Sequence, residues 1–200
     1  MVQIGVYGLG GISRRVIQGV LFSRNANLYA VCSSSIEKAD AFKEEYGAKK
    51  AYDNYEKMLQ DTNIDMIYIC TPNYLHAKHI QLALANHKHV VCEKPMCVSS
   101  EELHACFDYA HQQNCFLMEA HKTVFTPLNH KLFEMISNEE LGEIKSIDAQ
   151  YATRLTEQIS DWHFNQAGAG CMFDIGVYPI CYANRMANSS IFRVSRFQDE

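Results

Sequence analysis

The sequence predicts an α/β fold with a doubly wound parallel sheet, followed by part of an α+β domain with an open, mainly antiparallel sheet. Three observations support this. Apolar runs alternate with segments of helical periodicity up to about residue 118. These runs are continuous, as in parallel strands that helices cover on both faces. Residues 145–151 instead alternate between apolar and polar, which is typical of a strand with one solvated face.

The first elements follow one another in strict alternation. Val2–Tyr7 is a continuous apolar run that predicts a buried strand, and Ile12–Phe22 carries apolar residues at helical spacing. A second strand is expected over Leu28–Cys32. Ser34 then stands three residues before Glu37, the spacing of a capping box, which predicts the start of the next helix.

The same alternation continues to the end of the first domain. Strands are expected at Asp65–Cys70, His89–Cys92 and Cys115–Met118, and helices at about Tyr74–Ala85 and from a capping box at Ser99 and Glu102 to about Gln113. Ligands of such sheets bind at the carboxyl ends of the strands. The motifs described below fall at these ends.

The pattern changes after Glu119. Thr126-Pro127 offers an N-cap and a proline at the first helical position, so a helix is expected to about Ile136. The alternating strand follows over Lys145–Tyr151. The chain is therefore expected to divide into residues 1–120 and 121–200.

Composition argues against several kinds of partner. The net charge is −5 and there is no basic cluster, so neither nucleic acid nor an anionic membrane is expected. The chain begins with a strand-like run rather than a signal peptide, and no apolar stretch reaches the roughly 18 residues of a membrane span. The eight cysteines form no C-x-x-C pair and indicate buried free thiols in a reducing, cytoplasmic compartment.

No metal site is expected. The nine histidines include two close pairs, His76 with His79 and His87 with His89. Both pairs have exposed-looking positions on helices or turns and lack a third convergent ligand.

A glycine-rich turn lies between the first strand and the first helix, and it reads Gly8-Leu9-Gly10-Gly11-Ile12-Ser13. The pyrophosphate of a dinucleotide needs close backbone approach and the free N–H groups of a helix N-terminus. Gly8 and Gly10 occupy the first two positions of the G-x-G-x-x-G fingerprint, and the small Ser13 replaces its third glycine. We expect this turn, including Gly11 and Ile12, to bind NAD or NADP, although glycine-rich turns are common and the motif alone is weak.

The end of the second strand bears on the choice between the two cofactors. An acid there would bond the ribose 2′-hydroxyl of NAD, but the sequence is Cys32-Ser33-Ser34-Ser35. Serines would not repel a 2′-phosphate, and Lys38 and Arg14 could approach one. We therefore favour NADP slightly over NAD. The alternative is that the serines only cap the second helix.

Two further motifs end neighbouring strands. Thr71-Pro72-Asn73-Tyr74-Leu75-His76 follows one strand, and Glu93-Lys94-Pro95-Met96 follows the next. A lysine in such a loop is more often only solvated. Together with the glycine turn, however, both segments resemble motifs of a known family, and this resemblance implies that Thr71, Asn73, His76, Glu93 and Lys94 bind the cofactor.

Together these motifs resemble the glucose–fructose oxidoreductase and inositol dehydrogenase family, Gfo/Idh/MocA, in which G-x-G-x-I, T-P-N-x-x-H and E-K-P occur in this order and at about these spacings. A fourth match is the stretch from Gly168 to Pro179, which resembles the family's glycine-rich entry to an active-site helix. The resemblance covers residues 2 to about 185. It implies an N-terminal Rossmann domain that binds NAD(P), followed by a substrate domain that also forms oligomers.

The chain departs from the family pattern at several positions. Tyr178 stands where many members carry histidine and, with Met118-Glu119-Ala120, looks more like the dihydrodiol dehydrogenase and glucose–fructose oxidoreductase branch. Ala169 replaces a common glycine, and His163 stands where that branch often has arginine, which puts substrate contact there in doubt. Members usually run well beyond 300 residues, so this 200-residue chain is expected to be C-terminally truncated.

The resemblance implies hydride transfer between nicotinamide C4 and a carbinol carbon of a sugar, polyol or dihydrodiol-like substrate. Tyr178 would give or take the proton. A free tyrosine has a pKa near 10, so a nearby ammonium, that of Lys94, would be needed to favour the phenolate. Asp174 lies four residues before Tyr178, shares its helical face, and would orient Lys94 or a substrate hydroxyl.

Two rival interpretations remain open at this point. A chain that lacks most of its substrate domain could bind the dinucleotide without turnover, or it could sense the cellular redox state through bound NADP(H). A complete second domain would favour a homo-oligomer, a dimer or a tetramer. The sequence does not name the substrate.

Overall fold

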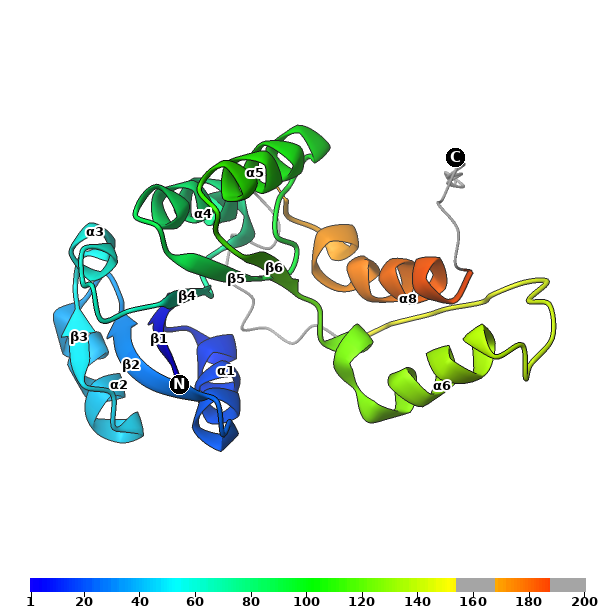
Figure 1. Ribbon diagram of the computed structural model, residues 1–200, viewed down its shortest axis with the longest axis horizontal. Coiled ribbons are helices and arrows are strands. Elements are labelled where there is room, and N and C mark those ends of the chain that lie inside the picture. Colours follow the sequence, from blue (N-terminus) through cyan, green and yellow to red (C-terminus); the bar gives the residue numbers. More distant parts are fainter. Residues whose placement is uncertain (154–167, 188–200) are drawn as a thin grey trace. The chain divides into compact units, whose positions relative to one another are not determined.

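The computed structural model describes residues 1–153 and 168–187 (Figure 1). The described chain divides into two compact units. The first comprises Met1–Ala120 and also includes Gly168; the second comprises, of the described residues, 121–153 and 169–187. None of the described helices is long and apolar enough to cross a membrane.

The first unit is built around a six-stranded sheet in which every pairing is parallel. Its strands are β1 (Val2–Tyr7), β2 (Ala26–Cys32), β3 (Lys50–Tyr52), β4 (Met66–Ile69), β5 (His89–Glu93) and β6 (Leu117–Ala120). They lie in the order β3-β2-β1-β4-β5-β6. The predicted parallel sheet is confirmed, and its switch point lies between β1 and β4, where such sheets bind ligands.

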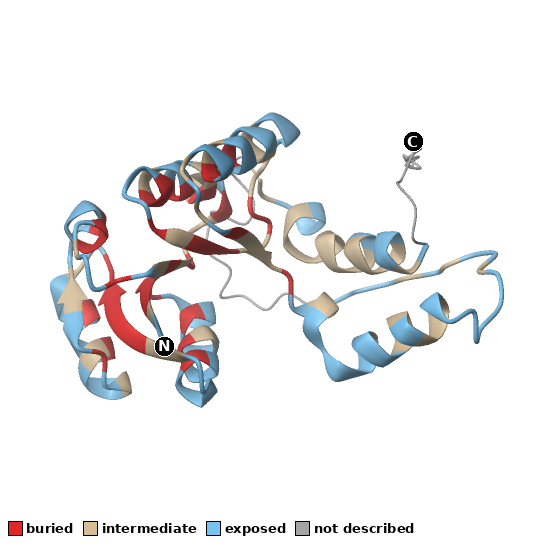
Figure 2. Ribbon diagram, viewed as in Figure 1, coloured by how far each residue is buried: buried red, intermediate tan, exposed pale blue. Residues whose placement is uncertain are grey.

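Helices cover both faces of this sheet (Figure 1). One core cluster takes side chains from α1 (Gly11–Phe22) and α2 (Ile36–Tyr46). The other takes them from α3 (Tyr55–Leu59), α4 (His76–Ala85) and α5 (Ser100–Gln112). Figure 2 shows the buried residues concentrated in the strands between these helices. Burial on both faces is why the strands are apolar throughout.

Two predicted helix starts are confirmed by their caps. Ser99 Oγ accepts a hydrogen bond from the Glu102 backbone N–H at 3.2 Å, and Glu102 Oε2 accepts one from Val98 N at 3.2 Å. Thr126 Oγ1 accepts from Asn129 N at 3.4 Å and begins α6 (Pro127–Ser137). Each side chain satisfies a backbone donor that has no partner within the helix.

The predicted cap of the second helix is wrong by one residue. Ser35, not Ser34, is the N-cap of α2, and its Oγ accepts from Lys38 N at 3.2 Å. The Ser33 backbone N–H still bonds to Tyr52 O at 3.1 Å, so the chain stays tied to β3 after β2 ends. Because of this extra contact with the sheet, α2 begins one residue later than predicted.

Sequence periodicity did not reveal β3 and α3. They contain three and five residues, too few for a recognisable period. The short 3₁₀ helix η1 (Asn73–Leu75), which leads into α4, was likewise included in the predicted helix.

The second unit differs from the expectation. Its described residues form the 3₁₀ helix η2 (Lys122–Phe125), α6, the π-helical segment η3 (Met172–Gly176) and α8 (Val177–Ala187), with no strand among them. The strand predicted over Lys145–Tyr151 is therefore wrong, and no antiparallel sheet occurs in the described part of this unit. A strand needs a hydrogen-bonded neighbour, and residues 145–151 have none among the described residues.

The cysteines are only partly as expected. Cys32, Cys70, Cys92 and Cys106 are buried thiols, as expected. Cys97, Cys115 and Cys181 are half-buried, and Cys171 is exposed. Burial raises the pKa of the Cys32 thiol to about 12, so this thiol remains protonated at neutral pH.

Candidate active site

The carboxyl ends of the parallel strands bring the motifs of the first unit to one edge of the sheet. Gly8 follows β1, Ser33 follows β2 and Thr71 follows the end of β4. Glu93 is the last residue of β5, and Lys94 comes directly after it. This is the edge at which open parallel sheets bind nucleotides.

Gly8 is required by the close approach of β1 to β4. Its φ is +94°, and a Cβ atom there would lie 2.7 Å from the carbonyl carbon of Cys70. The Gly8 backbone N–H bonds to Cys32 O at 3.1 Å. Only glycine adopts this conformation at no cost and leaves room for the neighbouring backbone.

Glycine occurs at positions 10 and 11 for a different reason. A Cβ atom at either position would meet nothing within 4 Å, so the protein itself does not require glycine there. Gly10 is the N-cap of α1 and forms no side-chain cap. Ser13 is fully buried, and its hydroxyl donates to Gly10 O at 2.7 Å, which explains why serine can replace the third glycine. The open N-terminus of α1 fits a pyrophosphate.

The end of β2 provides fewer positive charges than the sequence suggested. Ser33 is buried, whereas Ser34 and Lys38 are exposed. Arg14 Nη1 donates to Glu45 Oε1 at 2.6 Å and to Tyr46 Oη at 2.9 Å. Arg14 is thus paired with an acid of α2.

Asp53 is a residue of this edge that the sequence analysis missed. Cys32 pairs with Tyr52 in the sheet, so Asp53 follows β3 beside the end of β2. It is exposed and lies 4.0 Å from the Lys57 ammonium. The three-residue β3 is too short to leave a recognisable period, so the sequence alone does not place Asp53 at this edge.

Asn73 presents an unused acceptor at this edge. Its side-chain N–H donates to Gly168 O at 2.8 Å, but its buried Oδ1 has no hydrogen-bond partner among the described residues. Gly168 has φ +79°, and a Cβ atom on it would lie 2.4 Å from Val98 Cγ1. A buried acceptor without a partner costs free energy. The Asn73 Oδ1 atom fits a donor such as a ribose hydroxyl or the carboxamide of NAD(P).

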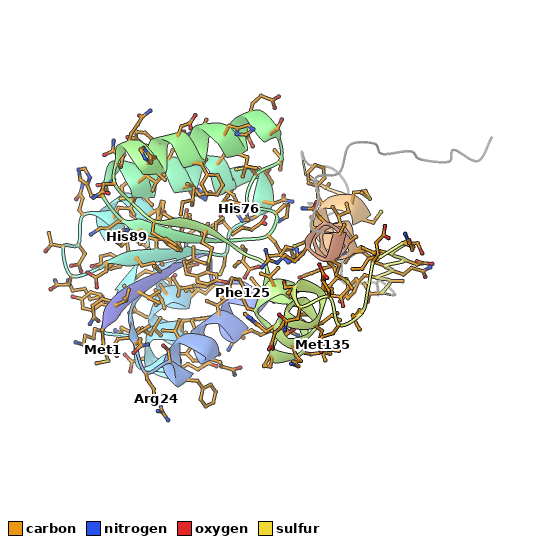
Figure 3. All side chains as sticks on the ribbon, turned by 45° about the vertical axis from the view of Figure 1, so that its right-hand side comes forward. Met1, Arg24, His76, His89, Phe125 and Met135 are labelled. Carbon is orange, nitrogen blue, oxygen red and sulfur yellow. The ribbon has the colours of Figure 1, made fainter. Side chains whose placement is uncertain are left out.

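His76 and His79 are not exposed as expected, because both are buried. His76 lies beyond the end of β4, whereas His89 begins β5 at the opposite end of the sheet (Figure 3). His76 Nδ1 lies 2.9 Å from Pro95 O and Nε2 lies 2.7 Å from Thr71 O. Two carbonyl partners favour the doubly protonated ring, although burial lowers the pKa of His76. The ring connects the loop after β4 to the one after Lys94.

His79 also contacts the loop after β4. Its Nδ1 lies 3.0 Å from Thr71 Oγ1, and its ring packs edge-on against Tyr7 and Tyr55. Burial lowers the pKa of His79 to about 4, so it is neutral at pH 7. Among the described residues, no three His, Cys, Asp or Glu side chains are grouped as a metal site would need.

Two acids hold the chain around Lys94. Tyr68 Oη donates to Glu93 Oε1 at 3.0 Å, and burial raises the pKa of Glu93. Glu119 Oε1 accepts from the Met96 backbone N–H at 2.8 Å. Lys94 itself is half-buried. These contacts fix the backbone on both sides of the lysine.

The other two predicted catalytic residues belong to the second unit. Asp174 lies in η3 and Tyr178 in the first turn of α8. Asp174 N bonds to Gly170 O at 3.1 Å, and Gly170 has φ +93°. Local π-helical turns frequently mark functional sites. His163, whose substrate contact was in doubt, lies outside the described residues.

His121 and Lys122 surround Tyr178 and were also missed. The His121 ring lies edge-on to Tyr178, with the centroids 5.3 Å apart, and the Lys122 ammonium lies 5.0 Å from the Tyr178 centroid. His121 is the one buried residue among the described positions of this unit. Its Nδ1 has no hydrogen-bond partner there. No motif marks either residue in the sequence.

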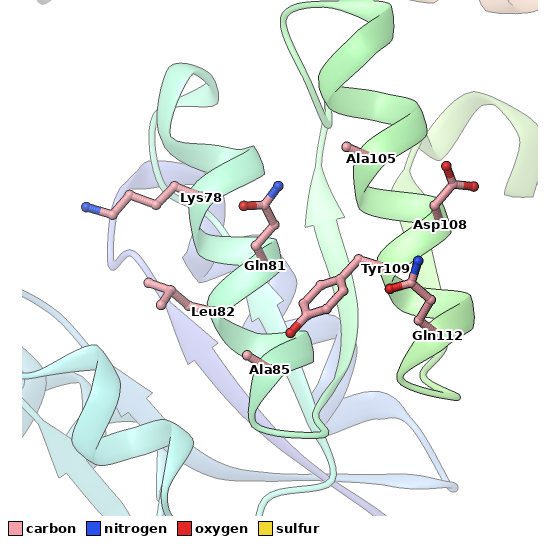
Figure 4. A pocket seen from close by; sticks show the side chains of 8 residues that line it. All are labelled: Lys78, Gln81, Leu82, Ala85, Ala105, Asp108, Tyr109 and Gln112. Carbon is pink, nitrogen blue, oxygen red and sulfur yellow. The ribbon is translucent and has the colours of Figure 1, made fainter.

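A groove of about 630 Å³ lies elsewhere on the first unit, between α4 and α5 (Figure 4). Its lining residues are Lys78, Gln81, Leu82, Ala85, Ala105, Asp108, Tyr109 and Gln112. All of them come from the two helices and none from the strand ends, so the groove is separate from the residues described above.

Comparison with known proteins identifies the family. Residues 2–121 match the oxidoreductase family with an NAD-binding Rossmann fold, and residues 130–198 match the GFO/IDH/MocA C-terminal domain. The chain belongs to the Gfo/Idh/MocA oxidoreductase family. The family predicted from the four motifs is confirmed.

Two curated relatives show the range of the family. The chain is 31% identical to D-xylose 1-dehydrogenase (NADP(+)) 2 of Haloferax volcanii, over 90% of this chain and 56% of that protein. It is 33% identical to the trans-1,2-dihydrobenzene-1,2-diol dehydrogenase of Mus musculus, over 79% of this chain and 47% of that one. The chain thus spans about half the length of the curated relatives it matches.

Among solved structures, the chain resembles a 3-ketoreductase from Actinomadura kijaniata in complex with NADP and TDP-benzene. The TM-score is 0.84 and the identity 28%, over 92% of this chain and 56% of that one. Two further structures of that ketoreductase carry a lysine-to-alanine and a tyrosine-to-phenylalanine change.

Proposed function

We propose that this protein is an NAD(P)-dependent oxidoreductase that transfers a hydride between nicotinamide C4 and a carbinol carbon of a sugar, polyol or dihydrodiol-like substrate. The observation that carries the proposal is Lys94 directly after β5, at the strand edge that also carries the glycine turn. The open N-terminus of α1 and the unused Asn73 Oδ1 support cofactor binding at this edge.

The residues would divide the work as follows. Bound nicotinamide supplies the hydride acceptor or donor. Tyr178 takes the proton from the carbinol oxygen during oxidation and returns it during reduction. The Lys94 ammonium favours the phenolate form of Tyr178, and the Asp174 carboxylate orients Lys94 or a substrate hydroxyl. His76 holds the loop that follows Lys94.

NADP(H) is our preferred cofactor, with the remaining binding contacts from the turn and from Ser33, Ser34 and Lys38. No acid lies in Ser33–Ser35, and Ser34 and Lys38 are exposed after the end of β2, the strand end that commonly distinguishes the two cofactors. Asp53 at the neighbouring strand end favours NAD(H) instead, because a carboxylate repels a phosphate. Assembly into a dimer or tetramer is also part of the proposal.

The experiment is turnover by purified protein of D-xylose, scyllo-inositol and trans-1,2-dihydrobenzene-1,2-diol with either cofactor. For any substrate that reacts, Lys94→Met and Tyr178→Phe should each lower kcat by about 10²-fold or more, the usual size of acid–base catalysis. Tyr182→Phe, one turn further along α8, is the matched control and should leave kcat nearly unchanged. Full activity in the Tyr178→Phe variant would refute the proposed role.

A second candidate function is dinucleotide binding without turnover, as a redox sensor or as a partner of a longer relative. It is favoured by one observation: every residue proposed to bind the cofactor lies in the first unit. Binding of NADPH with no turnover of any polyol would support this candidate and oppose the first.

A further inference from the structure

Tyr178 has a cationic neighbour within its own unit. Lys122 begins η2, and α8 packs against η2. The Lys122 ammonium lies 5.0 Å from the centroid of the Tyr178 ring, within the usual range of a cation–π contact. Both residues of this pair belong to the second unit.

Two aromatic rings also lie beside the Tyr178 ring. His121 meets it edge-on at 5.3 Å, and Tyr151 lies at 5.3 Å with its plane tilted by 42°. His121 Nε2 lies 3.2 Å from Val177 O, which fixes the imidazole beside the first turn of α8. Asp174, four residues earlier, is the nearby acid in sequence, and its charge opposes that of Lys122.

The contact acts differently on the two protonation states of the tyrosine. A neutral phenol attracts an ammonium only through the electron density of its ring. A phenolate carries a full negative charge, so its attraction to the ammonium is stronger. The ammonium therefore favours loss of the phenolic proton.

We propose that Lys122 is an electrostatic positioning residue for Tyr178, whose ammonium favours the phenolate form that accepts the carbinol proton. The inference rests on the proposed catalytic role of Tyr178. In oxidation the carbinol C–H electron pair leaves as hydride to the nicotinamide, and the O–H proton passes to the Tyr178 oxygen. A carbonyl product and a neutral tyrosine result. Lys122 exchanges no proton and acts only through its charge.

The test is an ultraviolet titration of phenolate formation, which needs no substrate. The chain has 11 tyrosines, so the step due to Tyr178 is identified by subtracting the titration of Tyr178→Phe. In Lys122→Met and Lys122→Gln this step should move up by about 0.5 pH unit, the size expected for an exposed charge pair in water. Lys122→Arg keeps the charge and should restore the wild-type midpoint.

Lys131→Met is the matched control, because Lys131 is an exposed lysine of the same unit that pairs with Glu134 at 3.2 Å. Its midpoint for Tyr178 should equal that of the wild type. An unchanged Tyr178 midpoint in both neutral Lys122 variants would overturn the inference, as would an equal shift in Lys122→Arg.

The inference and the proposed function can fail separately. A shifted midpoint without turnover would uphold the electrostatic role of Lys122 and count against the proposed function. In an active enzyme the basic limb of the kcat/KM profile should move with the midpoint. Turnover that depends on Tyr178 but shows no shift in either measurement would refute the role of Lys122 alone.

Discussion

Gly8 and Gly10 of the glycine turn have different roles. The fold requires glycine at position 8, because its φ is +94° and the backbone of Cys70 lies close to where a Cβ atom would be. Gly10 has ordinary extended angles, φ −98° and ψ −164°, and open space around it. We infer that Gly8 is needed for the stability of the fold and Gly10 for binding of the ligand.

This difference leads to a prediction. Gly10→Val should abolish NADPH binding, because its side chain would enter the path of the pyrophosphate, while the free energy of unfolding changes by less than about 1 kcal/mol. Gly8→Ala should instead lower that free energy by about 2 kcal/mol or more. NADPH fluorescence and urea unfolding measure the two effects. Equal NADPH binding by Gly10→Val and wild type would contradict the assignment.

At the scale of elements, the residues that we propose to set cofactor choice lie where β2, β3 and α2 meet. The sequence suggested two cations and no acid, but Arg14 is paired with Glu45 and Asp53 lies beside the end of β2. Residues from separate elements thus contribute opposing charges. The balance depends on the pairing of β2 with β3, which no local motif reveals.

The corresponding prediction is that NADP(H) binds at least as tightly as NAD(H). Ser33→Asp should shift the preference toward NAD(H), and Asp53→Asn should shift it further toward NADP(H), because each changes the charge facing a 2′-phosphate. Titration of both cofactors measures this. A tenfold preference of the wild type for NAD(H), about 1.4 kcal/mol, would contradict the prediction.

At the scale of the whole molecule, the proposed catalytic residues are divided between two units. Lys94 belongs to the first unit, while Asp174 and Tyr178 belong to the second. The first unit has an extensive buried core, whereas His121 is the one buried residue among the described positions of the second. We expect catalysis to require both units, because neither carries the complete set.

A double variant tests this expectation in an active preparation. If Lys94 and Tyr178 act as one unit, Lys94→Met combined with Tyr178→Phe should lower kcat little more than either single change. Independent residues would instead multiply their effects, so a product of the two single losses would refute the coupling.

The sequence by itself determined the parallel sheet apart from β3, the longer helices that cover it, and the family. Burial on both faces forces continuous apolar strands, and side-chain caps such as Ser99 and Thr126 mark helix starts, so both leave local patterns. The four motifs were recognised for the same reason, because each is a short contiguous stretch.

The features that depend on residues distant in sequence were decided only by the tertiary structure. The strand expected over Lys145–Tyr151 has no partner strand among the described residues, and the three-residue β3 forms because β2 is available to pair with it. Asp53 beside β2 and Lys122 beside Tyr178 likewise come from separate segments. Such contacts leave no local period, because hydrogen bonding and charge act across space and not along the chain.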